Sequence, residues 1–127
     1  MTNRKNILVV DDELDVQHLF KQMFRKEIKS GEIIFDFAFS GEEALLLLKK
    51  KEPADIVLIL SDINMPGMNG LELLKNIKKD YSHLKVFMIT AYSDEENYRE
   101  AVTNGADDYL NKPLDFENLK NKILSIG

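Results

Sequence analysis

Five polar residues lie within two residues of the ends of short apolar stretches of the sequence: Asp11, Asp12, Asp62, Thr90 and Lys112. Carboxylates that lie close together repel one another unless a cation lies between them. Mg²⁺ prefers oxygen ligands, and a carboxylate beside such a cation can attack phosphorus and form an aspartyl phosphate. If the fold brings these residues together, their side chains therefore predict a magnesium-dependent phosphoryl-transfer site.

Asp62 is the strongest candidate for the nucleophile. It follows the apolar run IVLILS, and the turn MPGMNG soon after it would keep the backbone tight and the carboxyl group open to a donor. The Lys112 ammonium can neutralise charge on phosphoryl oxygens, and the Thr90 hydroxyl can donate a hydrogen bond to one of them. We therefore expect the Asp62 carboxylate to be reachable from solvent, with the Lys112 ammonium within a side chain's reach.

Composition disfavours several other classes of protein. The chain has 127 residues, no cysteine and a net charge of −5, and this acidic balance argues against direct nucleic-acid binding, which needs a concentrated basic face. Without cysteine, and with His18 and His83 away from the five polar residues, a zinc site is not expected. The longest apolar stretch, Ile56–Leu60, is too short to span a bilayer, so we expect a cytoplasmic protein without a membrane segment.

Short apolar runs alternate with helical patterns along the chain. The runs predict strands over residues 6–10, 33–39, 56–60, 86–90 and 108–111. Helices are expected to begin at Glu13, Ser40, Asn69, Ser93 and Asp115, the first of them continuing to about Glu27. Strict alternation predicts one α/β domain, a parallel sheet with helices on both faces. Such sheets bind ligands outside the carboxyl ends of their strands, where the five polar residues lie.

Four motifs resemble the receiver domain of bacterial two-component response regulators. They read VVDDE, DINMPGMNGLELL, ITA and GADDYLNKP, and the similarity extends from about Lys5 to Leu124. The resemblance implies a single receiver domain over residues 1–127. It also implies a flavodoxin-like fold, a doubly wound five-stranded parallel sheet of strand order 2-1-3-4-5 with five helices.

The resemblance also assigns roles by position. Asp62 would accept the phosphoryl group, and Mg²⁺ would be held by the carboxylates of Asp11, Asp12 and Asp62 and the backbone carbonyl of Asn64. The phosphoryl group would be contacted by Lys112 and by the switch residue Thr90, with Tyr109 as the switch aromatic. Asn64 and Tyr92 would tune the phosphoryl lifetime. The bond between Lys112 and Pro113 would be cis, which is affordable only before proline.

The partners implied are those of a signalling switch rather than of a metabolic enzyme. A phosphohistidine on a sensor histidine kinase or a histidine phosphotransfer protein would be the donor, and the domain would catalyse its own phosphorylation and dephosphorylation. The fourth helix, fifth strand and fifth helix, with Tyr98, Ala101, Val102 and Tyr109 on or near them, would form the face that an effector or output domain reads. Both a monomer and a phosphorylation-dependent dimer fit this interpretation, as do a single-domain regulator and a segment of a longer one.

Two rival interpretations remain. A Mg²⁺-dependent phosphohydrolase would place its nucleophile after the first strand with a second acid two residues on, a pattern that Asp11 and Glu13 match loosely. Such enzymes need a cap or a longer chain for substrate specificity, which 127 residues would not supply. A receiver-like adaptor that works without phosphorylation would not need all five polar residues.

Overall fold

The computed structural model describes residues 4–50, 56–91 and 95–126. It contains five strands, β1 (Lys5–Val10), β2 (Ile33–Ala38), β3 (Ile56–Asp62), β4 (Lys85–Thr90) and β5 (Asp108–Asn111). The helices in this part of the chain are α1 (Leu14–Met23), α2 (Arg25–Ser30), α3 (Gly41–Lys50), α4 (Gly70–Asp80), α5 (Glu95–Thr103) and α6 (Phe116–Leu124). None of these helices is long and apolar enough to cross a membrane.

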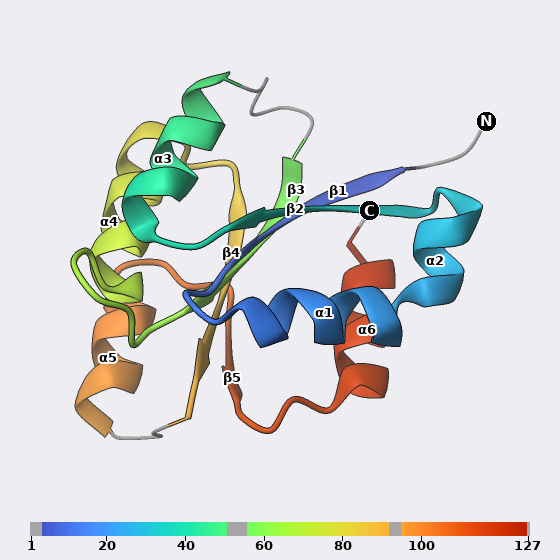
Figure 1. Ribbon diagram of the computed structural model, residues 1–127. Coiled ribbons are helices and arrows are strands. Elements are labelled where there is room, and N and C mark those ends of the chain that lie inside the picture. Colours follow the sequence, from blue (N-terminus) through green and yellow to red (C-terminus); the bar gives the residue numbers. More distant parts are fainter. Residues whose placement is uncertain (1–3, 51–55, 92–94, 127) are drawn as a thin grey trace.

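All neighbouring strands are parallel, in the order β2-β1-β3-β4-β5 (Figure 1). This confirms the α/β class, the doubly wound sheet and the strand order that the resemblance implied. The chain leaves β1 toward one side of the sheet and returns to add β3 on the other. The topological switch point therefore lies between the ends of β1 and β3, where this class of sheet binds its ligands.

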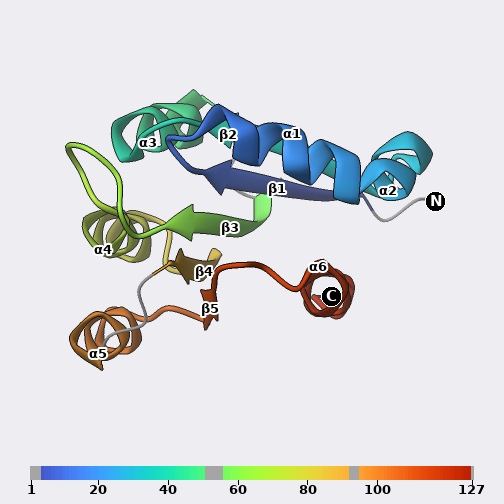
Figure 2. The ribbon, with the colours of Figure 1, turned by 60° about the horizontal axis from the view of Figure 1, so that its bottom comes forward.

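Helices cover both faces of the sheet, with α1, α2 and α6 on one face and α3, α4 and α5 on the other (Figure 2). Strand β1 shows why both faces are apolar. Ile7 and Val9 pack with Phe20 and Leu119 on one side, whereas Leu8 and its alternate neighbours pack toward α3 and α4 on the other. Successive side chains of a strand point to opposite faces, so a strand buried on both sides needs a continuous apolar sequence.

The helix predicted from Glu13 to Glu27 is in fact two helices, α1 and α2, separated at Phe24. This residue leaves helical geometry, with φ −107° and ψ 23°, and its ring is fully buried, 5.8 Å from the Phe20 ring. Burial of the second ring accounts for the local break, although the hydrogen bond from the Phe24 N–H to the Phe20 carbonyl is retained. The described residues thus form six helices, where the resemblance implied five.

Helix caps agree with the sequence where the structure describes them. Asn69 and Glu72 form a complete capping box at the start of α4, and the Asp115 side chain accepts a hydrogen bond from the Asn118 N–H at the start of α6. Ser40 Oγ accepts from the Glu43 N–H before α3. Ser93 lies outside the described residues. These caps fix where each helix starts, and so the length of the loops that follow the strands.

Candidate functional site

Three carboxylates meet at the switch point. Asp11 directly follows β1, and Asp62 is the last residue of the central strand β3. One carboxylate oxygen from each of Asp11, Asp12 and Asp62 lies within 4.8 Å of the others. Asp12 is exposed, whereas Asp11 is 7% and Asp62 6% exposed. The expected convergence is therefore present, with Asp62 more covered than the open carboxylate that we expected.

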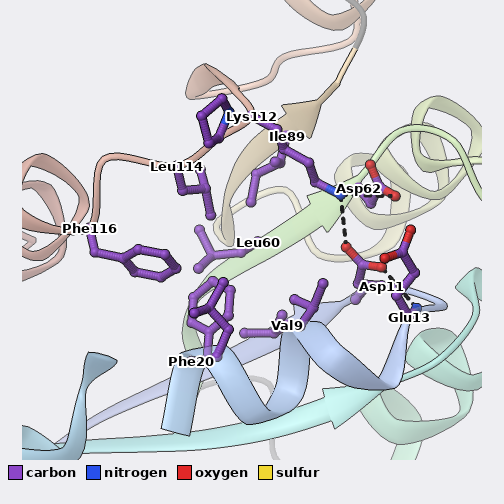
Figure 3. Close-up of a pocket in the computed structure, with 14 residues that line it drawn as sticks. Val9, Asp11, Glu13, Phe20, Leu60, Asp62, Ile89, Lys112, Leu114 and Phe116 are labelled. Atoms are coloured by element: carbon purple, nitrogen blue, oxygen red, sulfur yellow. Dashed lines mark hydrogen bonds and ion pairs between the residues drawn. The ribbon is translucent and has the colours of Figure 1, made fainter. Parts of the chain in front are cut away.

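Lys112 supplies positive charge to this cluster. It follows β5, and its Nζ lies 3.3 Å from Oδ2 of Asp11 and 3.7 Å from Oδ2 of Asp62 (Figure 3). Burial opposes the charged ammonium, but the carboxylates of Asp62 and Asp11 outweigh it and raise the pKa of Lys112 above its ordinary value. Lys112 therefore remains a cation, poised between the two buried carboxylates.

The Asp62 carboxyl group is electrostatically unfavourable as an anion in this position. Burial and, after it, the charge of Asp11 raise its pKa from 3.8 to about 6, with Asp12 adding to the effect. The Lys112 ammonium and a hydrogen bond donated by the Asn64 backbone N–H act in the opposite direction and do not cancel it. A carboxylate held in this way gains from any cation that joins it.

Backbone hydrogen bonds tie the strand ends together and fix these side chains. The Ile63 N–H donates to the Ile89 carbonyl at 2.9 Å, and the Lys112 N–H donates to the Thr90 carbonyl at 2.8 Å. The Asp11 carboxylate accepts from the Glu13 N–H at 3.0 Å. The peptide bond between Lys112 and Pro113 is cis, as expected. The ends of β3, β4 and β5 thus form one connected support for the site.

The remaining predicted site residues lie around this centre. Thr90 ends β4 and is fully buried. Tyr109 lies in β5, half-buried, with its hydroxyl oxygen covered and its ring edge-on to Tyr98 at 5.3 Å. Asn64 is exposed in the loop after β3. Tyr92 lies outside the described residues. The structure thus brings Asp11, Asp12, Asp62 and Lys112 together, with Thr90 one strand away.

The donor set fits a hard divalent cation. The cluster offers only carboxylate oxygens, and the backbone of Asn64 is adjacent to Asp62 in space. Mg²⁺ is bound by one or two carboxylates with waters completing its shell, so it suits a half-open oxygen site better than zinc, which prefers nitrogen and sulfur.

Two features of the site escaped sequence reasoning. Gly70, the first residue of α4, lies so close that an added Cβ would be 2.1 Å from the Asp62 carbonyl oxygen. An apolar cavity of about 460 Å³ also opens beside Asp11, Asp62 and Lys112 (Figure 3). Its walls come from α1, the sheet and the segment after β5, including Val9, Phe20, Leu60, Ile89, Leu114 and Phe116. The glycine signal was present in the turn MPGMNG, whereas the cavity depends on how far apart α1 and α6 lie.

Replacing Lys112 with Met should raise the pKa of Asp62 above about 6 in metal-free buffer. The cation that lowers this pKa would be lost, while burial and the charge of Asp11 would remain. The carboxyl carbon of Asp62 can be followed by NMR across a pH titration. A Lys85→Met control, at the opposite end of the sheet in β4, should leave the titration unchanged; an equal shift in both variants would contradict the assigned contact.

Comparison with known proteins gives a consistent result. The sequence matches the response regulator receiver domain model over residues 7–124. It is 33% identical over 125 residues to chemotaxis protein CheY-3 of Vibrio cholerae, covering 97% of this chain and 92% of that protein. Sporulation initiation phosphotransferase F of Bacillus subtilis is 34% identical over 123 residues, covering 97% of this chain and 93% of its own.

A solved structure agrees with the sequence comparisons. A chain of the CheX–CheY–BeF3–Mg²⁺ complex from Borrelia burgdorferi superposes with a TM-score of 0.82 at 32% identity, covering 96% of this chain and 88% of that one.

Proposed function

Because the chain belongs to the response regulator receiver domain family, we propose that Asp62 accepts a phosphoryl group from a phosphohistidine of a partner protein. The family makes it a two-component signalling domain rather than a classical enzyme. Our proposal extends to one receiver domain over residues 1–127, to the named acceptor and to a cytoplasmic location, where a kinase or phosphotransfer partner would supply the phosphoryl group.

One observation carries the proposal. Two buried carboxylates share a single ammonium, with Lys112 Nζ 3.3 Å from Asp11 and 3.7 Å from Asp62. Charges of one sign are costly to bury unless they are paired, and one ammonium does not balance the cluster of Asp11, Asp12 and Asp62. A purely structural strand end would not need this arrangement, whereas a site that receives a phosphoryl group does.

The chemistry follows from the positions of these groups. An unprotonated Asp62 oxygen attacks phosphorus, the bond from phosphorus to the donor imidazole nitrogen breaks, and that nitrogen keeps the electron pair and takes a proton. The product is an acyl phosphate on Asp62. The Lys112 ammonium, already within 3.7 Å of the acceptor oxygen, neutralises part of the charge on the phosphoryl group.

Asp11, Asp12, Asp62 and the Asn64 carbonyl would hold Mg²⁺, which when bound supplies the positive charge that offsets phosphoryl oxygens. Thr90 at the end of β4 is the group that would move toward a phosphoryl oxygen and donate a hydrogen bond to it. Tyr109 would move with Thr90. The face formed by α5, β5 and α6, which correspond to the expected fourth helix, fifth strand and fifth helix, would change for a downstream effector or output domain. The same site would later hydrolyse the acyl phosphate.

Mass spectrometry can test the acceptor assignment. Incubation with a small acyl phosphate and Mg²⁺ should add one phosphoryl group to the intact protein. Reduction of the acyl phosphate with borohydride, followed by digestion, should place the modified residue in the peptide that contains Asp62. A modified Asp11 or Asp12 in place of Asp62 would overturn the proposal, as would turnover of a generic phosphomonoester without a stable protein adduct.

Removing divalent cations should reduce labelling by about 100-fold or more, because the charge on the transferred group would then be offset by Lys112 alone. The measurement is the rate of incorporation in EDTA against that in excess Mg²⁺. A second readout is independent of chemistry: Mg²⁺ should raise the unfolding temperature, because it relieves repulsion within the carboxylate cluster. Labelling that is equally fast in EDTA would contradict the proposed metal site.

A further inference from the structure

The outer edge of the sheet carries a basic groove that the phosphoryl-transfer site does not use. Strand β2 is the end strand and, within the described residues, pairs only with β1. The groove has a volume of about 510 Å³ and is lined by Lys21, Arg25 and Lys29 together with apolar residues of α2 and β2 that include Phe35 and Phe37. From this groove we infer a docking site for an extended segment of a partner protein in which acidic and apolar residues alternate.

Strand β2 has an outer edge whose backbone groups face away from the sheet. The carbonyls of Glu32 and Ala38 accept hydrogen bonds from the chain of β1 at either end of the strand. Backbone groups of alternate residues point to opposite edges of a strand, so those of Ile33, Phe35 and Phe37 point away from the sheet. An unpaired edge of this kind is a template for one more strand.

The groove beside this edge carries three positive charges. Lys21, Arg25 and Lys29 are exposed, and none of them has an ion-pair partner among the residues that the structure describes. Lys21 lies over the Phe37 ring, 5.8 Å from its centre. Three adjacent cations without acidic partners stand out on a chain whose net charge is −5. They favour a partner that is locally acidic.

Nearby acidic residues do not neutralise these cations. Glu27 points to α6, where its Oε2 lies 3.5 Å from Lys120 Nζ. Asp36 lies on β2, but Phe35 and Phe37 pack with the α1 and α2 side of the core, so strand alternation places Asp36 on the other face of the sheet. The groove therefore keeps its positive charge.

The distances between the cations and between alternate residues of a strand favour a particular sequence in the partner segment. Arg25 and Lys29 lie four residues apart in α2, about 6 Å along that helix, whereas Lys21 lies in α1, before the break at Phe24. Every second residue of a strand advances by about 6.6 Å. Helix α1 runs opposite in direction to β2, and α2 turns away from this line near the start of β2 (Figure 1). A strand added to β2 would place alternate side chains on the face that carries Lys21, Arg25 and Lys29, which favours acidic residues at those positions.

The side chains between the acidic ones would face the other side of the sheet. There Ile34 is the most exposed apolar residue of β2, at 37%. An apolar residue in the added strand would cover it. The partner segment is therefore expected to alternate acidic and β-branched apolar residues over about five positions or more.

The test uses a fluorescent peptide of about seven residues that alternates glutamate and valine. We expect saturable binding measured by anisotropy, with NMR shift changes confined to the amides of β2, α1 and α2. The combined substitutions Lys21→Glu, Arg25→Glu and Lys29→Glu should weaken binding by about tenfold or more. The control variant Lys75→Glu, Lys79→Glu changes two exposed lysines of α4 and should leave binding within about twofold.

Strand addition and simple charge attraction give different results with modified peptides. N-methylation of one alternate set of peptide amides should abolish binding, whereas N-methylation of the other set should not. A scrambled peptide of the same composition that binds equally well would overturn the proposal. So would absence of binding to the peptide together with binding to vesicles of anionic phospholipid. Phosphate labelling at Asp62 is measured separately, so failure here leaves the proposed function intact.

Discussion

Replacing Asp62 with Asn is expected to abolish phosphoryl incorporation and, in the same protein, to increase the free energy of unfolding at pH 7. Incorporation is lost because an amide oxygen cannot form the acyl phosphate. Stability rises because the substitution removes a buried charge that Asp11 and Asp12 repel. The rise in the pKa of Asp62 from 3.8 to about 6 corresponds to about 3 kcal/mol. This value is the upper limit for the gain in unfolding free energy at neutral pH.

The pH dependence fixes the sign of this effect. Native Asp62 binds its proton more tightly than the unfolded chain does, so folding is favoured most below pH 3.8 and loses this contribution as the pH rises through about 6. In metal-free buffer the difference in unfolding free energy between Asp62→Asn and the parent should be about 1–3 kcal/mol at pH 7. The difference between the two proteins should become small near pH 4, because folded Asp62 is then mostly protonated and its replacement removes little charge from the native protein.

Urea unfolding in EDTA at the two pH values measures the difference directly. The variant Asp12→Asn serves as a comparison. Because Asp12 is exposed, its replacement should stabilise the protein less than Asp62→Asn does. Added Mg²⁺ should stabilise the parent more than Asp62→Asn, since the cation relieves the same repulsion. An Asp62→Asn protein that is no more stable than the parent at pH 7 would show that the cluster is not strained as the structure indicates.

The sequence determined which residues could meet, but not how deeply they are buried. Strand β3 is apolar from Ile56 to Leu60 because it lies at the centre of the sheet, and the position of Asp62 at its end could be derived from that pattern. The 6% exposure of Asp62 could not, because it depends on the loop after β3 and on Lys112 folding over the carboxylate from β5. Local patterns specify the strand and its end; tertiary packing sets the dielectric environment that shifts the pKa.

The break at Phe24 illustrates the same distinction. The apolar stripe of Val16, Leu19, Phe20, Met23 and Phe24 is typical of one continuous helix. Phe20 and Phe24 are buried and Val16 packs with them, whereas Leu19 and Met23 are 43% and 41% exposed. The Phe24 ring packs not only with Phe20, one helical turn away, but also with Phe35 of β2 and Phe116 of α6, which local sequence could not place beside it. The caps at Asn69 and Asp115 could be predicted because each is decided within four residues of chain.

Replacing Gly70 with Ala is expected to destabilise the fold by about 3 kcal/mol and to slow phosphoryl incorporation in the fraction that folds. The added Cβ would lie 2.1 Å from the Asp62 carbonyl oxygen and 2.8 Å from the Ile63 Cα. Both atoms belong to the backbone and cannot rotate away. Relief requires a shift of α4 or of the acceptor strand itself, although the Gly70 N–H donates to the Ile63 carbonyl at 2.8 Å and holds them together.

Gly41→Ala is the matched control, since Gly41 is likewise the first residue of a helix, α3. The three atoms nearest its added Cβ would be Met68 Sδ at 2.9 Å, Cγ at 3.1 Å and Cβ at 3.2 Å, all in one unbranched side chain and none in the backbone. Chemical unfolding should therefore show a change within about 1 kcal/mol for Gly41→Ala and the larger loss for Gly70→Ala. Equal stability of the two variants would mean that α4 can withdraw from the acceptor strand at little cost. The position of Asp62 would then depend on Lys112 and on the carboxylate cluster, rather than on the close packing of α4 against β3.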